Sequence, residues 1–335
     1  MNNAWPPSKT PQECAAALEA FSPPTPPIHS ISLDWCIKEF SAEIDVLRLD
    51  LLDSELGGNK WYKLKPHLNA AFNQGKTRVI SFGGAHSNHL YALAAAAQRF
   101  GFASLGIVRG LVKEGAPLTP TLSDAVSYGM QLQFVSRAEY AQRYDQQWCQ
   151  QLAAQHNAYL IPEGGASETA LEGLAELARF IAPKYDKVLV ACGTGTTLAG
   201  LVRGLSKPAV ASPCVTGISA LKDDGSTAAR VSQLLAASEH TVPWTVNANY
   251  HGGGFAKLSP ELVAFIDQFE QHTHIPLDPV YNSKLFFAVV ELIKTGELKV
   301  HSTTKGANTL VLHTGGLQGG RAMADRMARM RHRSR

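Results

Sequence analysis

The sequence predicts an α/β protein built from two open, twisted, mainly parallel sheets that are flanked by helices. Apolar runs of strand length alternate with amphipathic runs of helix length, a pattern typical of parallel sheets covered by helices. With 335 residues, the chain is too long for one small core. The expected elements also outnumber those of a single doubly wound sheet, so we expect two domains.

These elements run from residue 44 to residue 330. Apolar runs predict strands at 44–51, 78–82, 104–108, 131–135, 158–161, 187–191, 214–219 and 308–313. Amphipathic runs predict helices at 60–73, 87–100, 119–128, 138–155, 168–182, 197–205, 226–237, 259–272, 282–294 and 317–330. Residues 1–30 contain seven prolines, and we expect them to wrap the surface without regular structure.

Composition and charge argue against several classes of protein. No run of 18 apolar residues occurs, so we expect no membrane span, and the N-terminus does not resemble a secretory signal. The five cysteines form no C-x-x-C pair and the histidines show no zinc spacing, so we expect a cytoplasmic protein without a metal site. The last fifteen residues hold six arginines, but the net charge is only +3. We therefore expect the solvated end of a last helix and no nucleic-acid partner.

A lysine opens the helix that follows the first glycine-rich turn, Gly57-Gly58-Asn59-Lys60. The positive end of a helix dipole favours the neutral, nucleophilic form of an amine, which can then bond to an aldehyde cofactor. Taken alone, such a segment is more often a surface lysine at a helix start.

Ser87 and Asn88 follow the expected strand 78–82, in the segment G-G-A-H-S-N that spans residues 83–88. These residue types cap helices, and a capping turn also presents side chains and N–H groups to a ligand. Both roles are compatible.

A third turn, C-G-T-G-T-T at residues 192–197, follows the expected strand 187–191. Consecutive amides, hydroxyls and a helix N-terminus predict a cup for a monophosphate, although helix capping alone also produces such turns. Leu198 stands at the third glycine position of a dinucleotide fingerprint, and no Walker lysine follows. A nicotinamide or nucleotide enzyme is therefore disfavoured.

Two further segments near the C-terminus carry polar side chains. D-P-V-Y-N spans residues 278–282, and H-T-G-G spans residues 313–316 after a strand. Tyr281 could act as an acid or a base, or only pack and form one hydrogen bond.

Taken together and in order, G-G-N-K, G-G-x-x-S-N, G-T-G-T-T, D-P-V-Y and H-T-G-G resemble the family of 1-aminocyclopropane-1-carboxylate deaminase and D-cysteine desulfhydrase, from about residue 44 to residue 320. The resemblance implies the tryptophan-synthase β-like fold, which is fold type II among enzymes that use pyridoxal 5'-phosphate (PLP). It also suggests a homodimer. We expect a large PLP-binding domain of residues 1–62 and 163–335 and a small domain of residues 63–162.

The resemblance also implies roles for single residues. Lys60 matches the lysine that bonds to PLP, and it is the leading general base for the α proton of the substrate. Asn88 matches a residue that hydrogen-bonds the PLP ring hydroxyl. Ser87 and Tyr281 match catalytic residues beside the substrate. The other cofactor contacts are assigned to Gly193, Thr194, Gly195, Thr196, Thr197, Asn282 and Thr314.

Four positions depart from the family pattern and bear on the substrate. His86 replaces a usual Gln, and Phe255 stands in place of a second active-site tyrosine. Asn282 and Thr314 stand where the deaminase branch has Glu and Leu and the desulfhydrase branch has two Thr. We therefore expect a D-cysteine desulfhydrase-like α,β-elimination that turns a small amino acid into a 2-oxo acid and ammonia. Deaminase-like opening of the cyclopropane ring, and a catalytically silent PLP-binding or sensor protein, remain alternatives.

Overall fold

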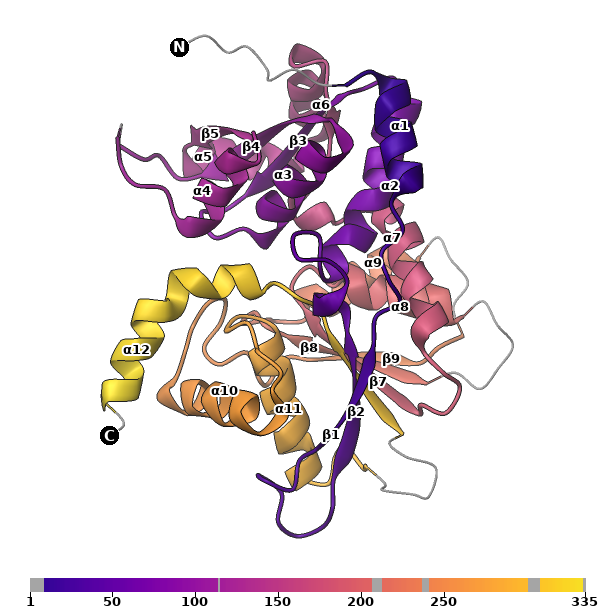
Figure 1. The fold of residues 1–335 in the computed structure, drawn as a ribbon, viewed down its shortest axis with the longest axis vertical. Helices are drawn as coiled ribbons and strands as arrows, with labels where there is room; N and C mark the ends of the chain where they lie inside the picture. Colours follow the sequence, from indigo (N-terminus) through magenta and orange to yellow (C-terminus); the bar gives the residue numbers. More distant parts are fainter. Residues whose placement is uncertain (1–8, 114, 207–212, 237–240, 301–307, 334–335) are drawn as a thin grey trace. The chain divides into compact units, whose positions relative to one another are not determined.

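A computed structural model of the chain describes residues 9–113, 115–206, 213–236, 241–300 and 308–333, and Figure 1 labels most of its helices and strands. The chain divides into two compact units. Unit 1 comprises Met1–Pro24 and Lys60–Ala170, and unit 2 comprises Thr25–Asn59 and Leu171–Arg335. Each unit contains one mainly or wholly parallel sheet, which confirms the predicted fold class.

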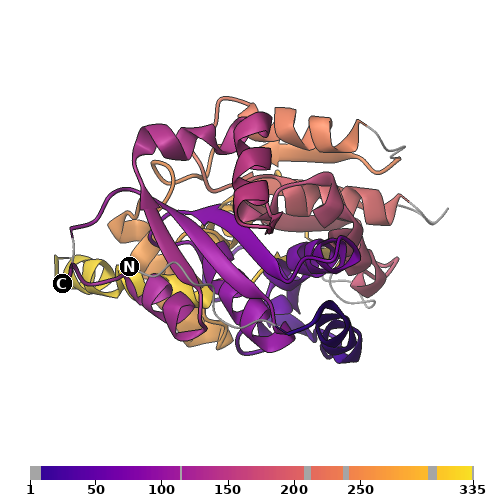
Figure 2. The same ribbon diagram turned by 90° about the horizontal axis from the view of Figure 1, so that it is seen from above.

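The sheet of unit 1 is wholly parallel, with the strand order β5-β4-β3-β6. In Figure 2 its strands run side by side in purple and magenta. The strands are β3 (Arg78–Gly83), β4 (Ala103–Arg109), β5 (Gln131–Val135) and β6 (Tyr159–Leu160). The helices are α1 (Pro11–Ala20), α2 (Asn59–Asn73), α3 (Asn88–Phe100), α4 (Pro120–Ser127), α5 (Arg137–Ala141) and α6 (Gln146–Gln155). Ile80, Phe82 and Ile107 form a core with Tyr140 and Leu152 from the helices that follow β5.

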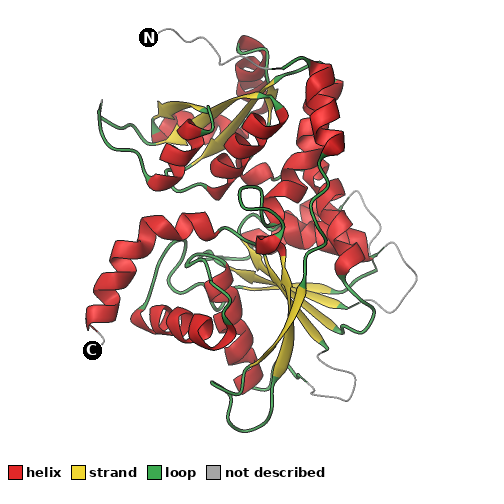
Figure 3. Ribbon diagram, in the orientation of Figure 1, coloured by secondary structure: helices red, strands yellow, loops and turns green. Residues whose placement is uncertain are grey.

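The sheet of unit 2 has the strand order β1-β2-β10-β7-β8-β9, and only the edge strand β1 is antiparallel to its neighbour. The strands are β1 (Ile28–Ser32), β2 (Glu43–Arg48), β7 (Lys187–Cys192), β8 (Cys214–Ser219), β9 (Trp244–Asn247) and β10 (Thr309–His313). The helices are α7 (Glu168–Ala175, shared with unit 1), α8 (Thr196–Leu205), α9 (Ser226–Leu235), α10 (Pro260–Thr273), α11 (Asn282–Lys294) and α12 (Ala324–Arg333). Helices lie on both faces of this sheet (Figure 3), with α10 and α11 packed on Ile44, Val46 and Val311 of one face.

The proline-rich start is more regular than expected. Helix α1 lies wholly within residues 1–30, and strand β1 begins there at Ile28. The prediction of no regular structure in this segment is therefore wrong for its described part, residues 9–30. Pro11 occupies the first position of α1, where its missing N–H costs nothing, and Thr10 and Glu13 form a capping box before it. Residues 1–8 lie outside the described part of the chain.

The N-terminal segment belongs to unit 1, where the ring of Phe21 packs against two aromatic rings of that unit. The ring of Phe21 contacts the rings of Trp61 and Phe100, at centroid distances of 4.7 and 5.5 Å. The start of the chain therefore belongs to the smaller unit, whereas the expected domains place it in the large one. The PLP-binding domain of residues 1–62 and 163–335 stays a prediction.

Several other elements differ from expectation. The expected strand 44–51 ends at Arg48 and is followed by a 3-10 helix at Leu49–Leu51, and the expected helix 168–182 becomes a 3-10 helix at Glu176–Phe180. Strand β9 was not predicted, and the expected helix 138–155 is interrupted by a 3-10 turn at Gln142–Tyr144 before Asp145 caps α6. The expected helix 317–330 begins as a 3-10 helix at Leu317–Met323. Within the described ranges, no helix combines the length and the apolar character that a membrane crossing requires.

Candidate active site

The turn before Lys60 is tied to two other segments of unit 2. The N–H of Asn59 donates to the carbonyl of Thr314 at 3.1 Å. The side chain of Asn59 is buried and donates to Thr197 Oγ1 at 2.9 Å. Asn59 is therefore fixed within unit 2 both to the 314 turn and to the first turn of α8, and Lys60 is the next residue in the sequence.

Gly58 allows this close approach of two backbones. Its φ is +84°, and a Cβ built on it would lie 2.2 Å from the carbonyl oxygen of Thr314. A side chain at position 58 would therefore strain the backbone and separate the two turns.

Residues 193–197, the predicted phosphate cup, form a turn at the C-terminal end of β7. Helix α8 begins at Thr196, and its N-cap Gly195 offers no side chain to the first amides. The hydroxyls of Thr194 and Thr196 lie 2.9 Å apart, and Thr196 and Thr197 are buried. Uncapped amides, neighbouring hydroxyls and the positive end of the dipole are the features that bind a phosphate. A phosphorylated cofactor therefore fits this turn.

Tyr281 lies next to this phosphate cup. A Cβ built on Gly193 would lie 3.1 Å from Cε1 and 3.4 Å from the hydroxyl oxygen of Tyr281. The ring of Tyr281 also meets the ring of Phe255 edge-on, with the centroids 6.2 Å apart. Unit 2 thus brings Tyr281 together with the predicted cup.

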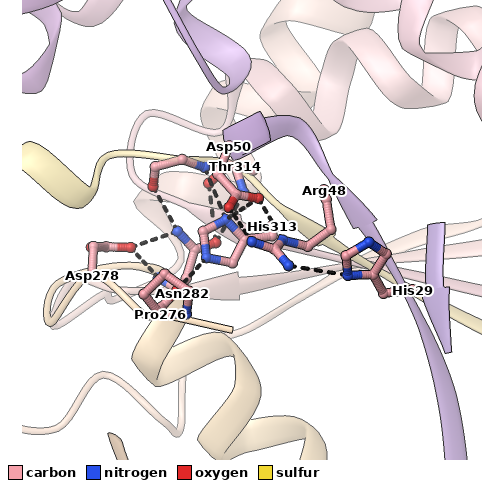
Figure 4. A network of polar contacts seen from close by, with 9 residues as sticks. His29, Arg48, Asp50, Pro276, Asp278, Asn282, His313 and Thr314 are labelled. Atoms are coloured by element: carbon pink, nitrogen blue, oxygen red, sulfur yellow. Dashed lines mark hydrogen bonds and ion pairs between the residues drawn. The ribbon is translucent and has the colours of Figure 1, made fainter. Parts of the chain in front are cut away.

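Asn282 joins the two C-terminal segments (Figure 4). Its Nδ2 donates to Asp278 Oδ2 at 2.5 Å and to the carbonyl of Gly315 at 2.8 Å. Its Oδ1 accepts from the N–H of Thr314 at 3.0 Å and from the hydroxyl of Thr314 at 3.3 Å. The side chain is fully buried, and both amide hydrogens are donated within the protein. The direct contact with PLP that the sequence suggests for Asn282 stays a prediction.

Asn282→Asp is expected to lower the free energy of unfolding by about 3–5 kcal/mol. The carboxylate would donate neither hydrogen bond and would place a second buried negative charge beside Asp278. Urea unfolding measures the loss. Asn308→Asp is the matched control, because Asn308 also donates to an aspartate, Asp186, at 3.2 Å, but on the exposed surface. We expect less than about 1 kcal/mol there, and equal losses would contradict the role of Asn282.

A buried charged cluster lies next to the H-T-G-G segment (Figure 4). Nε and Nη2 of Arg48 donate to the two carboxylate oxygens of Asp50 at 2.8 and 2.6 Å. Nδ1 of His313 lies 3.1 Å from Asp50, and its Nε2 donates to the carbonyl of Pro276 at 2.8 Å. Burial raises the pKa of Asp50, but Arg48 and His313 lower it by more, to well below its ordinary value. The cluster links the ends of β2 and β10 and so fixes the residue that follows, Thr314.

Ser87 and Asn88 lie in unit 1, between the end of β3 and the start of α3. Ser87 Oγ accepts from the N–H of Leu90 at 3.2 Å, which confirms its capping role. A Cβ on Gly83 would lie 2.5 Å from Ser87 Oγ, so this turn depends on the glycine. The contacts of Ser87 with substrate and of Asn88 with PLP stay predictions. His86 is exposed.

Helix α2 carries a row of basic side chains in unit 1 that the sequence analysis missed. Lys60, Lys63 and His67 share one helix face, and Lys63 and His67 are buried. Burial lowers the pKa of His67 to about 4. Burial, followed by the charges of Lys60 and Lys63, holds the pKa of His89 far below its ordinary value. Both shifts favour the neutral forms of these two imidazoles.

A lysine at the start of one helix, in unit 1, and an uncapped, hydroxyl-lined helix start, in unit 2, are both features of enzymes that carry a phosphorylated aldehyde cofactor. Comparison with known proteins agrees with this class. The chain belongs to the pyridoxal-phosphate dependent enzyme family, whose model matches residues 24–315. The protein is therefore an enzyme whose cofactor is PLP, as the sequence predicts.

Two curated proteins and one solved structure illustrate the likeness. The chain is 29% identical over 306 residues to the mitochondrial bifunctional D-cysteine desulfhydrase/1-aminocyclopropane-1-carboxylate deaminase of Arabidopsis thaliana, covering 85% of this chain and 75% of that one. It is 25% identical over 291 residues to the D-cysteine desulfhydrase of Serratia proteamaculans, covering 82% and 86%. The crystal structure of an ACC deaminase homologue matches with a TM-score of 0.74 and 27% identity, covering 95% and 99%. These matches confirm the predicted family resemblance and the type II fold.

Proposed function

We propose that the protein is a lyase that removes a β substituent and the amino group from a small amino acid, as a D-cysteine desulfhydrase does. The observation that carries this proposal is the pair Asn282 and Thr314. Both side chains are neutral, and the hydroxyl of Thr314 donates to Asn282. The names of two relatives include the same activity.

A neutral pair at these positions favours elimination over ring opening. PLP, when bound, supplies an electron sink for negative charge at the α carbon of the substrate. A carboxylate next to the cofactor would strengthen that sink by keeping a proton on it, and an amide or hydroxyl would not. Loss of a thiolate from the β carbon needs less of this help than cleavage of a strained carbon–carbon bond does. D-cysteine and water would give pyruvate, hydrogen sulfide and ammonia.

The residues divide this work among them. Lys60 would bond to PLP and then move the α proton, since a neutral amine is both nucleophile and base. The 193–197 turn would bind the phosphate. Ser87 would contact the substrate, Asn88 the cofactor ring, and Tyr281 would hold or move a proton beside the cup.

A visible absorbance spectrum followed by a 2-oxo acid assay tests the proposal. The panel is D-cysteine, L-cysteine, D-serine and 1-aminocyclopropane-1-carboxylate. We expect a PLP band, and pyruvate with sulfide from D-cysteine at a rate at least about tenfold above 2-oxobutanoate from the cyclopropane substrate. The reverse order of rates would point to a deaminase. A PLP band without any 2-oxo acid would point to a silent PLP-binding protein, and either result contradicts the proposal.

We further propose a cytoplasmic homodimer without nucleic-acid or membrane partners. The family resemblance supports the dimer, and the free state of all five cysteines suits a reducing compartment. Sedimentation of the PLP-loaded protein, which separates one copy from two by mass, tests the dimer.

A further inference from the structure

Segment 251–257 of unit 2 has an unusual backbone next to the site. Gly252, Gly253 and Gly254 have φ values of +57°, +90° and +117°, and Ala256 has a φ of +53°. A side chain in this left-handed region costs about 1–2 kcal/mol. Such a conformation persists only where the surroundings hold it in place.

Two cations donate to the carbonyls on either side of residue 255 in this segment. Nζ of Lys284, on α11, donates to the carbonyl of Gly254 at 2.7 Å and to that of Ala220 at 3.1 Å. Nη1 of Arg326, on α12, donates to the carbonyl of Ala256 at 3.3 Å. The residue between these two carbonyls is Phe255.

Lys284 occupies its position at a cost in stability. Its side chain is 1% exposed, and none of the described carboxylates lies within ion-pair distance of it. Burial lowers the pKa of Lys284 to about 8, although the charge of Asp278 raises it. At neutral pH the ammonium is therefore buried without a counter-ion, an arrangement that packing alone does not explain.

Phe255 connects the segment to the active site. Its side chain is 51% exposed, an unusual state for a large apolar ring, and it contacts the ring of Tyr281. Tyr281 in turn packs against Gly193 of the phosphate cup. A shift of Phe255 would therefore change the surroundings of the Tyr281 ring.

We propose that Lys284 is a positioning residue for the active site. Through the carbonyl of Gly254 it holds segment 251–257 so that Phe255 and Tyr281 form an apolar wall beside the cup. Such a wall accommodates a small apolar or thiol side chain of an amino acid and disfavours a charged one. The proposal rests on the proposed function in one respect, that an amino acid binds beside Tyr281.

Hydrogen exchange of the PLP-loaded, full-length protein tests the anchor without relying on activity. In Lys284→Met, we expect the amides of residues 251–257 to exchange at least about tenfold faster than in the unmodified protein. Lys294→Met is the matched control, because Lys294 lies on the same helix but is exposed and pairs with Glu291 at 2.9 Å. Unchanged exchange at 251–257 in Lys284→Met would overturn the proposal.

The pH dependence of the free energy of unfolding tests whether Lys284 is needed for positioning the segment or for folding of the whole chain. The pKa of Lys284 is about 8 in the folded chain, below its ordinary value, so the unfolded chain binds more protons above pH 8. The free energy of unfolding should therefore gain a rising contribution as pH increases from about 8 to 10. Lys284→Met should stay folded and lack this contribution. If it does not fold, Lys284→Gln, which keeps two donors without charge, replaces it. Failure of both variants to fold would make Lys284 a folding residue and overturn the proposal.

Ligand binding tests the wall. The spectral change of bound PLP on addition of D-cysteine or of glycine reports binding. We expect Lys284→Met to weaken D-cysteine binding about tenfold, to raise KM equally and to change kcat by less than about threefold. If Lys284→Met speeds hydrogen exchange at residues 251–257 but leaves the affinity for D-cysteine unchanged, the proposed apolar wall is wrong. If no amino acid is converted, the proposed function fails, but the exchange and binding comparisons still decide the role of Lys284.

Discussion

Lys60→Ala is expected to lower kcat by at least about 10³-fold and to abolish the visible band of lysine-bound PLP. The substitution removes both the amine that bonds to the cofactor and the leading base for the α proton, and a positioned base alone contributes about 10²–10⁴-fold. The cup at 193–197 and the anchor through Asn59 are unaffected, so the melting temperature should stay within a few degrees. An absorbance spectrum and the 2-oxo acid assay give the two readouts.

Lys65→Ala is the control for this experiment. Lys65 lies on the same helix and is partly buried, but the resemblance assigns it no role. We expect its spectrum and rates to match those of the unmodified protein. A visible band of ordinary intensity in Lys60→Ala would show that another amine bonds to PLP and would overturn the assignment of Lys60.

Gly58→Ala is expected to lower the free energy of unfolding by about 4 kcal/mol or more and to abolish PLP binding. The new Cβ would lie 2.2 Å from the carbonyl oxygen of Thr314, where only backbone atoms could yield. Separation of these turns would break the hydrogen bond from Asn59 to Thr314 and displace the start of α2. Urea unfolding and titration with PLP measure the two losses.

Gly129→Ala separates the clash from the backbone strain. Gly129 has a φ of +83°, close to the +84° of Gly58, but a Cβ built there meets nothing within 4 Å. We expect Gly129→Ala to cost only the left-handed strain, about 1–2 kcal/mol, and to leave PLP binding intact. Similar losses in the two variants would mean that the turns at 58 and 314 are free to move apart.

The elements that could be predicted from the sequence are those whose residues are mostly buried. Strands such as β3 and β7 are buried along nearly their whole length, so they read as continuous apolar runs. Four of the five residues of β1 are exposed, and β9 has only four residues. Neither strand therefore shows an apolar run or alternation that would predict it from the sequence. Helix α1 was not predicted because the seven prolines of residues 1–30 suggest irregular structure, although the Thr10–Glu13 capping box marks a helix start.

The candidate site was predictable only in its local parts. The turns at 57–60 and 193–197 are glycine-rich segments at the ends of recognisable elements, and the local sequence suffices to suggest their chemistry. The cluster joins His313 to Arg48 and Asp50, which lie far from it in the chain, and the local sequence around His313 does not predict this contact. Only the register of β2 and β10 brings them together.

The edge strand β1 bears on how copies of this protein can associate. It is short and antiparallel, and three of its five residues are His29, Ser30 and Ser32, all exposed. A brief polar edge is a poor template for strand pairing between molecules. The sheet of unit 2 is thus protected from growing into a fibril at this side when the protein is concentrated. A sheet continued across β1 is thus a disfavoured way to join two copies.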